Sequence, residues 1–546
     1  MSASENAVFD VPAPRNEPVL SYAPGSAERA ELKAELGRQR NAQVEIPLVI
    51  GGERITSGRT FEVREPHATA RSLGLCHKGD AASVLAAADA AVAAGHEWSR
   101  RSFEERASVF LKAAELLAGP WRARLNASTM LGQSKTCFQA EIDAACELID
   151  FFRFNVAFGR QLLAVQPASA PGIWNRCEYR NLEGFVFAVT PFNFTSIAAN
   201  LCTAPALMGN TVVWKPASTA VHSGWQLMQL FEAAGLPPGV INFVPGSGAE
   251  IGDPALARPD LAGVHFTGST GVFQGMWRTV GENVANYAAY PRLVGETGGK
   301  DFVFAHTSAD VDALAVALLR GAFEYQGQKC SAASRAYIPK SMWRDLKQRL
   351  VAEVAAISMG DPNDFSHFMS AVIDKGSYTK CKRYIDQAAA DPRSSLVVGG
   401  ECDDSEGWFV RPTIIETSDP AAPSLCEEIF GPILTVMPYD DDELDATLEL
   451  CDRGSPYALT GAIFADDRAA VAHMSDRLRH AAGNFYVNDK PTGAVVGQQP
   501  FGGGRASGTN DKAGSLLNLI RWTSVRTIKE TFVPATEWRY PHMRDD

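Results

Sequence analysis

The stretch that decides the fold lies between residues 184 and 306 and contains six short apolar segments. They read GFVFAVTPF (184–192), NTVVWKP (210–216), VINFVPG (240–246), AGVHFTG (262–268), RLVGETGG (292–299) and DFVFAH (301–306). Most are separated by enough residues to form a helix. Apolar strands that alternate with helices are typical of βαβ units, which build a mostly parallel sheet. We therefore predict an α/β fold with a doubly wound sheet.

The alternation continues from residue 309 to about residue 492. A helical segment precedes GQKC (327–330), and strands are expected at SRAYIPK (334–340), ILTVMPY (433–439) and LTGAIFA (459–465). The chain has 546 residues, and single hydrophobic cores stop growing near roughly 250–300 residues. We therefore predict a second α/β domain.

The part before residue 184 is mainly helical. Apolar residues at helical spacing or Ala-rich composition predict helices over residues 27–40, 80–95, 103–118 and 140–158. The compact fold is expected to begin near Val44.

Composition excludes several classes of protein. The net charge is −12 and Lys and Arg form no cluster, so nucleic acid is not expected as a partner. The ten cysteines show no C-x-x-C pair, which predicts reduced thiols and no metal site. The sequence has neither an apolar run of about 18 residues nor a secretion or transit pattern, so we expect no membrane association and a cytoplasmic protein.

Three separate residues could carry chemistry. Cys330 follows a helical segment among small and polar residues, Glu296 ends an apolar strand, and Asn193 follows another strand. Taken singly, each has an ordinary structural interpretation, because a lone cysteine usually packs as a small hydrophobe. Strand ends of a doubly wound sheet meet at one crevice, however, so Glu296 and Asn193 are expected there.

A glycine-rich turn follows the strand at His265. HFTGSTG (265–271) leads from a strand into a helix, where backbone N–H groups can bind a pyrophosphate. The turn lacks the G-x-G-x-x-G pattern, so alone it is weak evidence.

Seven motifs, taken in order, resemble the aldehyde dehydrogenase superfamily over about residues 45–530. They are TPFNF (190–194), VWKP (213–216), FTGST (266–270), ETGGK (296–300), GQKCSA (327–332), EEIFGP (427–432) and PFGG (500–503). The resemblance implies a Rossmann-type NAD-binding domain, an α/β catalytic domain and a small β oligomerisation flap. It also implies at least a homodimer.

The resemblance places the domain boundaries as follows: an N-terminal arm and helix over 1–43, an NAD-binding domain from 44–170, 187–297 and 493–522, a catalytic domain over 298–492, and a flap from 171–186 and 523–546. A β-hairpin is expected near residues 171–186.

The resemblance also assigns the catalytic roles. Cys330 is expected to be the nucleophile, and it must react as thiolate. Helix N-terminal amides or the nicotinamide are expected to favour that form. The Asn193 amide and the Cys330 N–H form the expected oxyanion hole, and Glu296 is the expected general base.

For the cofactor, the resemblance implies NAD. Lys215 is expected at the adenosine ribose, the turn at Gly268 at the pyrophosphate, and Glu428 at the nicotinamide ribose. The full expected set is Thr190, Lys215, Gly268, Ser269, Thr270, Gly271, Val272, Glu428 and Phe430. Many relatives have Glu where this chain has Ser218, so NADP is expected to be tolerated.

Within the superfamily, the chain most resembles the dehydrogenases of L-glutamate γ-semialdehyde. The runs ELIDFFRFN (147–155), FEYQGQKCS (323–331) and PTGAVVGQQPFGG (491–503) carry this likeness, and the last continues to Asp511. It implies oxidation of this small aldehyde to L-glutamate, the second step of proline catabolism.

The likeness also implies a substrate pocket. The carboxylate is expected at Ser331, Gly493 and Ala494, the ammonium at Glu147, and the aliphatic chain between Phe194 and Phe501.

Two alternatives stay open. The first is a dehydrogenase of another aldehyde, such as succinate semialdehyde. The second is a non-catalytic structural member of the family, which would be expected to lack Cys330, Glu296 or Asn193.

Overall fold

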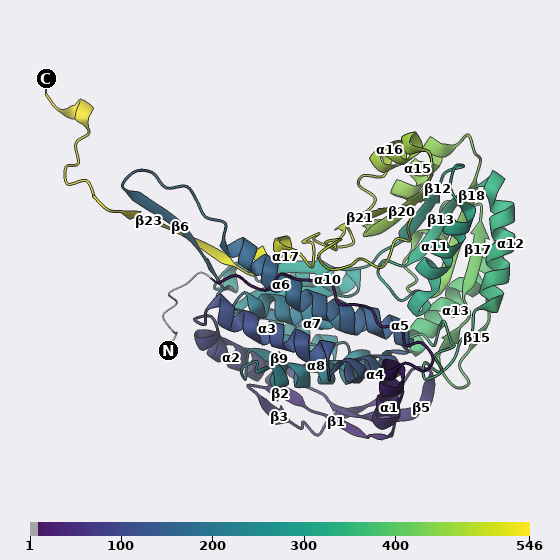
Figure 1. Cartoon of the computed structure of the whole chain (residues 1–546), viewed down its shortest axis with the longest axis horizontal. Helices are drawn as coiled ribbons and strands as arrows, with labels where there is room; N and C mark the ends of the chain where they lie inside the picture. Colours follow the sequence, from purple (N-terminus) through teal and green to yellow (C-terminus); the bar gives the residue numbers. More distant parts are fainter. Residues whose placement is uncertain (1–8, 546) are drawn as a thin grey trace.

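The computed structural model describes residues 9–545, and its two halves are each built on a seven-stranded sheet (Figure 1). The first sheet has the strand order β11-β10-β7-β8-β9-β2-β3. Its strands are β2 (Leu48–Ile50), β3 (Glu53–Ile55), β7 (Phe185–Val189), β8 (Thr211–Lys215), β9 (Ile241–Phe243), β10 (Leu261–Thr267) and β11 (Arg292–Glu296). Neighbouring strands from β7 to β11 pair in parallel, whereas β2 pairs antiparallel with both β9 and β3. The predicted mostly parallel sheet is confirmed.

The second sheet has the order β14-β17-β18-β13-β12-β20-β21. Its strands are β12 (Asp301–Ala305), β13 (Ala333–Pro339), β14 (Ser394–Val398), β17 (Thr413–Thr417), β18 (Ile433–Tyr439), β20 (Thr460–Phe464) and β21 (Asn484–Val487). Only the edge strand β14 pairs antiparallel with its neighbour. The predicted α/β fold with two sheets is therefore present. Parallel strands covered on both faces need apolar residues throughout, and β12 and β20 are buried along their whole length.

Helices cover both sheets, and a three-stranded sheet flanks the first (Figure 1). The small sheet contains β1 (Val44–Ile46), β4 (Thr60–Glu65) and β5 (Ala68–His77). The first half has α1 (Ala27–Asn41), α2 (Ala81–Trp98), α3 (Phe103–Ala118), α4 (Arg122–Gln133), α7 (Thr195–Leu207), α8 (Val221–Ala234), α9 (Gly248–Leu256) and α10 (Thr270–Glu282). The second has α11 (Val311–Phe323), α12 (Lys340–Ala356), α13 (Lys375–Ala390), α14 (Pro423–Cys426), α15 (Leu444–Arg453) and α16 (Arg468–Arg477), and α17 (Leu516–Ile520) follows β21.

Helix α3 shows why the helical predictions succeed. Its start is fixed by a capping box in which Ser102 and Glu105 exchange hydrogen bonds between side chain and backbone. Its buried residues recur at helical spacing. The predicted bounds, 103–118, agree with the structure.

The helix expected over 140–158 is present, but it extends over 137–163 and contains an irregular turn that was not predicted. The chain forms α5 (Cys137–Ala140), a π-helical turn (Glu141–Cys146) and then α6 (Glu147–Leu163). The π-helical turn presents one buried carboxylate to α4 and another to the residues that follow α4. Glu141 pairs with Arg122, and Asp143 pairs with Lys135 at 2.7 Å. These two ion pairs give a physical reason for the irregular turn, which apolar periodicity does not encode.

An extended arm projects from the body (Figure 1). It consists of β6 (Ile173–Arg180) and β23 (Ser524–Thr531), paired antiparallel over eight residue pairs. The hairpin expected near residues 171–186 has only one of its strands there: β6 pairs with β23, which belongs to the C-terminal segment 523–546 that was assigned to the same flap. Trp174 and Val525 on this arm are 51% and 45% exposed.

Residues 1–8 of the predicted N-terminal arm and residue 546 of the predicted flap lie outside the described residues. Within residues 9–545, no helix combines the length and apolar character needed to cross a membrane. In the same part of the chain, all ten cysteines are free thiols.

Candidate active site

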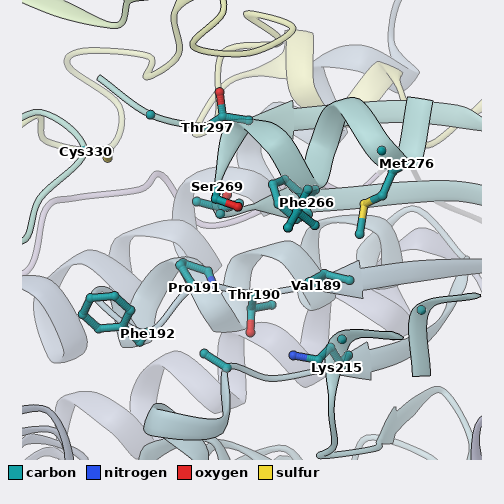
Figure 2. A pocket seen from close by; sticks show the side chains of 18 of the residues that line it. Val189, Thr190, Pro191, Phe192, Lys215, Phe266, Ser269, Met276, Thr297 and Cys330 are labelled. Carbon is teal, nitrogen blue, oxygen red and sulfur yellow. The ribbon is translucent and has the colours of Figure 1, made fainter. Parts of the chain in front are cut away.

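The main cavity lies where the parallel strands of the first sheet end, as expected for a doubly wound sheet. Its volume is about 740 Å³. Nine of the predicted site residues line it: Thr190, Asn193, Lys215, Gly268, Ser269, Val272, Cys330, Glu428 and Phe430. Figure 2 shows Cys330 towards one end and Lys215 and Met276 towards the other. The cavity therefore has the elongated form and the size that a dinucleotide needs.

The middle of this cavity carries the N-terminus of α10. Ser269 is the N-cap residue, and in the described chain its side chain makes no capping hydrogen bond. The first N–H groups of a helix lack intrahelical partners and attract anions. This end of α10 can therefore bind a phosphate group.

The loop that carries Cys330 has an unusual backbone. After α11 ends at Phe323, Tyr325, Gln326 and Gly327 have φ values of 49°, 55° and 62°. Such left-handed conformations cost free energy for residues other than glycine. At Gly327 a Cβ would collide with the carbonyl oxygen of Gly431. Only glycine therefore fits at position 327 of this loop.

No helix begins directly after Cys330. The residues after Cys330 enter strand β13 at Ala333, and the next helix begins only at Lys340. Burial raises the pKa of the Cys330 thiol well above its ordinary value, and the nearby Glu296 raises it further. Formation of the thiolate therefore needs a base.

Glu296 is placed to be that base. The Cys330 thiol donates a hydrogen bond of 3.3 Å to Glu296 Oε1. Burial raises the pKa of Glu296 to about 7, although the Cys330 hydrogen bond and the charge of Lys512 lower it. A carboxylate whose pKa lies near neutral pH is well matched to taking and returning protons.

Glu296 lines a second, smaller cavity of about 50 Å³. Its walls include Glu147, Phe501 and Lys512, and Cys330 is not among them. The Lys512 ammonium group donates to the carbonyl oxygens of Gly483 and Gly502 at 2.8 and 3.0 Å. The two cavities share Phe266 and Thr267 as wall residues, so they are neighbours.

Asn193 is held against the nucleophile loop. Its side-chain Nδ2 donates to the carbonyl oxygen of Gln328 at 3.1 Å. An amide nitrogen carries two N–H donors, so one is free to point at an oxyanion near Cys330.

Six predicted residues line neither cavity: Phe194, Thr270, Gly271, Ser331, Gly493 and Ala494. Thr270 instead contacts Tyr457 and the backbone of Gly298. Ser331 Oγ lies 2.8 Å from Thr492 Oγ1, and Thr492 directly precedes Gly493 and Ala494 in the chain. Gly493 has a φ of +95°, which favours glycine.

Glu147 is a buried carboxyl group that receives a 2.7 Å hydrogen bond from Ser196. Burial raises its pKa to about 8, and the charge of Asp143 adds to this effect. Lys135 and Lys329 oppose the shift. A cationic group bound beside Glu147 would favour its ionised form.

Several residues beside the site were not predicted, namely Gln133, Lys135, Tyr325, Gln326 and Lys512. Each owes its role to contacts with residues distant in the chain, such as Lys135 with Asp143, Phe194 and Tyr325. The one sequence signal that could have pointed to any of these residues is that Tyr325 and Gln326 belong to the FEYQGQKCS run around Cys330.

The fold and this site are those of one enzyme class. The profile described as "Aldehyde dehydrogenase family" matches residues 54–528, and the chain belongs to this family. It is 52% identical over 539 residues to the mitochondrial Δ1-pyrroline-5-carboxylate dehydrogenase of Dictyostelium discoideum, covering 98% of this chain and 97% of the relative. It is 48% identical to the human mitochondrial Δ1-pyrroline-5-carboxylate dehydrogenase, over 97% and 94% of the two chains.

A solved structure is similarly close. The Mycobacterium tuberculosis Δ1-pyrroline-5-carboxylate dehydrogenase bound with NAD shares 56% identity and a TM-score of 0.96, over 99% of this chain and all of the other.

Proposed function

We propose that this enzyme oxidises L-glutamate γ-semialdehyde, the open form of 1-pyrroline-5-carboxylate, to L-glutamate with reduction of NAD. This reaction is the second step of proline catabolism. The observation that carries the proposal is the Cys330–Glu296 hydrogen bond at the end of a dinucleotide-sized cavity. Full-length relatives near 50% identity that are named for this substrate support it.

The residues present fit NAD. The uncapped N-terminus of α10 suits a pyrophosphate, and Lys215 and Glu428 line the cavity on either side of it. Among the predicted cofactor residues, Thr190, Gly268, Ser269, Val272 and Phe430 also line the cavity, whereas Thr270 and Gly271 support the helix start. When bound, NAD supplies the hydride acceptor. NADP is proposed to be tolerated, since Ser218 stands where many relatives have Glu.

The first step is addition of Cys330 to the aldehyde. Glu296 takes the thiol proton, and the sulfur forms a bond to the carbonyl carbon. The carbonyl oxygen then carries negative charge, which the free N–H of Asn193 and the Cys330 backbone N–H stabilise. Loss of a hydride from the carbon leaves a thioester on Cys330.

The second step is hydrolysis of that thioester. Glu296 first releases the thiol proton to solvent and is then the base again, taking a proton from the water molecule that attacks the thioester carbon. The C–S bond breaks, L-glutamate leaves, and the sulfur is free for another turnover. The small cavity that Glu296 lines offers space for this water.

The substrate's charged end is proposed to bind away from the aldehyde. Ser331 and the backbone of Gly493 and Ala494 would hold the carboxylate, and Thr492 orients Ser331 through the 2.8 Å contact. Glu147 would pair with the ammonium group of the substrate, and this positive charge would stabilise the ionised form of Glu147. Phe194 and Phe501 would flank the aliphatic chain.

Assembly, domain boundaries and location are part of the proposal. Exposed apolar residues on the β6–β23 arm, among them Trp174 and Val525, suit contact with a second copy of the chain. We propose that the enzyme forms at least a homodimer, and a measurement of its mass by light scattering tests this.

We also propose the domain boundaries that were given from the sequence. A cytoplasmic location is also proposed, although the named relatives are mitochondrial, and imaging of the tagged full chain tests it.

The test measures NADH formation with 1-pyrroline-5-carboxylate, succinate semialdehyde and propanal, using Cys330→Ala as the control. A strong preference for the pyrroline that Cys330→Ala abolishes supports the proposal. Activity on the other aldehydes alone would favour the alternative dehydrogenase. Activity that survives Cys330→Ala would overturn the mechanism.

A further inference from the structure

Three consecutive residues at the end of α4 reach both loops of the active site. They are Gln133, Ser134 and Lys135, and Ser134 has a φ of +55° that turns the chain out of the helix. Gln133 contacts the loop that carries Asn193. Its Nε2 donates to the carbonyl oxygen of Phe192, and its Oε1 accepts from Thr195 Oγ1 at 3.2 Å.

The next two residues contact the loop that carries Cys330. Gln326 Nε2 donates to the carbonyl oxygen of Ser134 at 3.1 Å and to that of Ala371 at 2.7 Å. The Lys135 ammonium lies 4.4 Å from the centre of the Tyr325 ring. Tyr325 and Gln326 are the two non-glycine residues of this loop with left-handed backbone, so these contacts fall where the loop is strained.

Lys135 itself joins the two loops. Its ammonium also lies 4.4 Å from the ring of Phe194, which follows Asn193 directly. It pairs with Asp143 at 2.7 Å, and its side chain is completely buried. Two aromatic faces and one carboxylate therefore enclose the charge, an arrangement in which cation–π attraction is strong because water is excluded.

Burying a charge is costly, and a well-packed apolar side chain is often as stable. A lysine in this place therefore needs an explanation other than the stability of the core. We infer that Lys135 is a positioning residue that holds the Cys330 loop and the Asn193 loop in register through Tyr325 and Phe194. The inference rests on the proposed function, in which Cys330 is the nucleophile and Asn193 stabilises the oxyanion.

The expected consequence is catalytic. Small misplacement of a nucleophile relative to its oxyanion donor lowers the rate strongly, by up to about 10²-fold for 1 Å. Without the charge at Lys135, the rings of Tyr325 and Phe194 lose the cation that both contact, and the strained Tyr325 backbone loses one of the contacts that hold it.

The first test compares Lys135→Met with Arg122→Met. Both remove a buried cation of the α4 region that pairs with a carboxylate of the same π-helical turn, but Arg122 contacts Glu141 and the N-terminal arm rather than an active-site loop. We expect Lys135→Met to lower kcat about 10-fold or more for 1-pyrroline-5-carboxylate and propanal alike, with the KM for NAD within about twofold. Arg122→Met should lower Tm and leave kcat unchanged.

A second readout needs no aldehyde. The alkylation rate of Cys330 by iodoacetamide, followed by mass spectrometry of its peptide, should change at least about threefold in Lys135→Met and not in Arg122→Met. If wild-type enzyme oxidises no aldehyde, the proposed function fails while this comparison still decides the role of Lys135.

A third variant pair covers the case in which Lys135→Met does not fold. Tyr325→Leu removes the ring facing Lys135, whereas Tyr325→Phe keeps it and removes only a hydroxyl that has no hydrogen-bond partner among residues 9–545. Tyr325→Leu should lower kcat as Lys135→Met does, whereas Tyr325→Phe should retain most of the wild-type kcat. If Lys135→Met or Tyr325→Leu keeps wild-type kcat and alkylation rate while Tm falls, Lys135 is structural only and the inference is wrong.

Discussion

Cys330 and Glu296 are joined by a 3.3 Å hydrogen bond, yet each lines a cavity that the other does not. The nucleophile lines the cavity proposed for the cofactor, and the base lines the small cavity that Lys512 also borders. The small cavity has room for a water molecule beside Glu296, apart from the space proposed for the dinucleotide. The following predictions depend on this arrangement.

Replacement of Glu296 should slow both halves of the reaction, because Glu296 takes the Cys330 thiol proton and later activates water. We expect Glu296→Gln to lower steady-state kcat about 10²–10⁴-fold, the usual contribution of a general base. The first turnover of NADH should slow as well, so that no rapid burst precedes the steady state. Rapid-mixing absorbance measures both phases. A burst at the wild-type rate would show that Cys330 does not need Glu296 to lose its proton.

Replacement of Lys512 should shift the pH dependence of kcat. The positive charge of Lys512 lowers the pKa of Glu296, which burial raises to about 7. Lys512→Met removes that charge, so the pKa rises and the acid limb of the kcat profile moves to higher pH. Lys512→Arg keeps the charge and should leave the limb nearly in place. An unshifted limb in Lys512→Met would show that the two groups do not interact.

The same carboxyl group should reduce stability at higher pH. The pKa of Glu296 is about 7 in the folded protein and 4.5 in its ordinary state, so folding favours the protonated form. This contribution is complete below about pH 4.5 and is lost as pH rises through 7. Glu296→Gln should therefore be more stable than wild type above pH 7, by up to about 3 kcal/mol, from 1.36 kcal/mol per pKa unit. Denaturant unfolding at pH 5 and pH 8 checks this, and a gap that shrinks with rising pH would contradict it.

Asn193 should contribute mainly to the first chemical step. Removing one oxyanion donor typically lowers kcat about 10²–10³-fold, and we expect this for Asn193→Ala. The KM for NAD should change little, because other residues form most of the cofactor cavity. Steady-state kinetics with both substrates measure the two parameters. A loss confined to the KM for NAD would assign Asn193 to cofactor binding instead.

Ser218 should govern tolerance of NADP. It lies three residues after Lys215, at the start of a short 3₁₀ turn (Ser218–Ala220), and its side chain is exposed. A carboxylate there would repel a 2′-phosphate. We expect Ser218→Glu to lower kcat/KM for NADP at least about 10-fold and that for NAD less than about threefold. Equal losses with both cofactors would show that residue 218 does not contact the ribose.

Much of the fold was predictable because its signals are local. Apolar strands such as Phe185–Val189 and a capped helix such as Phe103–Ala118 are encoded by neighbouring residues. The motifs also predicted correctly that Cys330 and Glu296 belong to one site. The π-helical turn at Glu141–Cys146 was missed because ion pairs with Arg122 and Lys135, rather than apolar spacing, favour it.

The left-handed loop was missed for a related reason. Tyr325 and Gln326 have no sequence signature of positive φ, and they adopt it because Lys135, Ser134 and Ala371 hold them. The hairpin expected near residues 171–186 has only one of its strands there for a similar reason, since the partner strand of Ile173–Arg180 lies at the other end of the chain.

That distant pairing has a consequence for synthesis. Strand β6 leaves the ribosome before β23 exists, because Arg180 and its partner Ser524 are 344 residues apart. At about 5–20 residues per second, this interval is roughly 20–70 s. During this interval the edge of β6 has no partner strand in its own chain. A nascent chain on a neighbouring ribosome is then the nearest source of another strand. Completion of the arm is therefore a late event that follows folding of both large sheets.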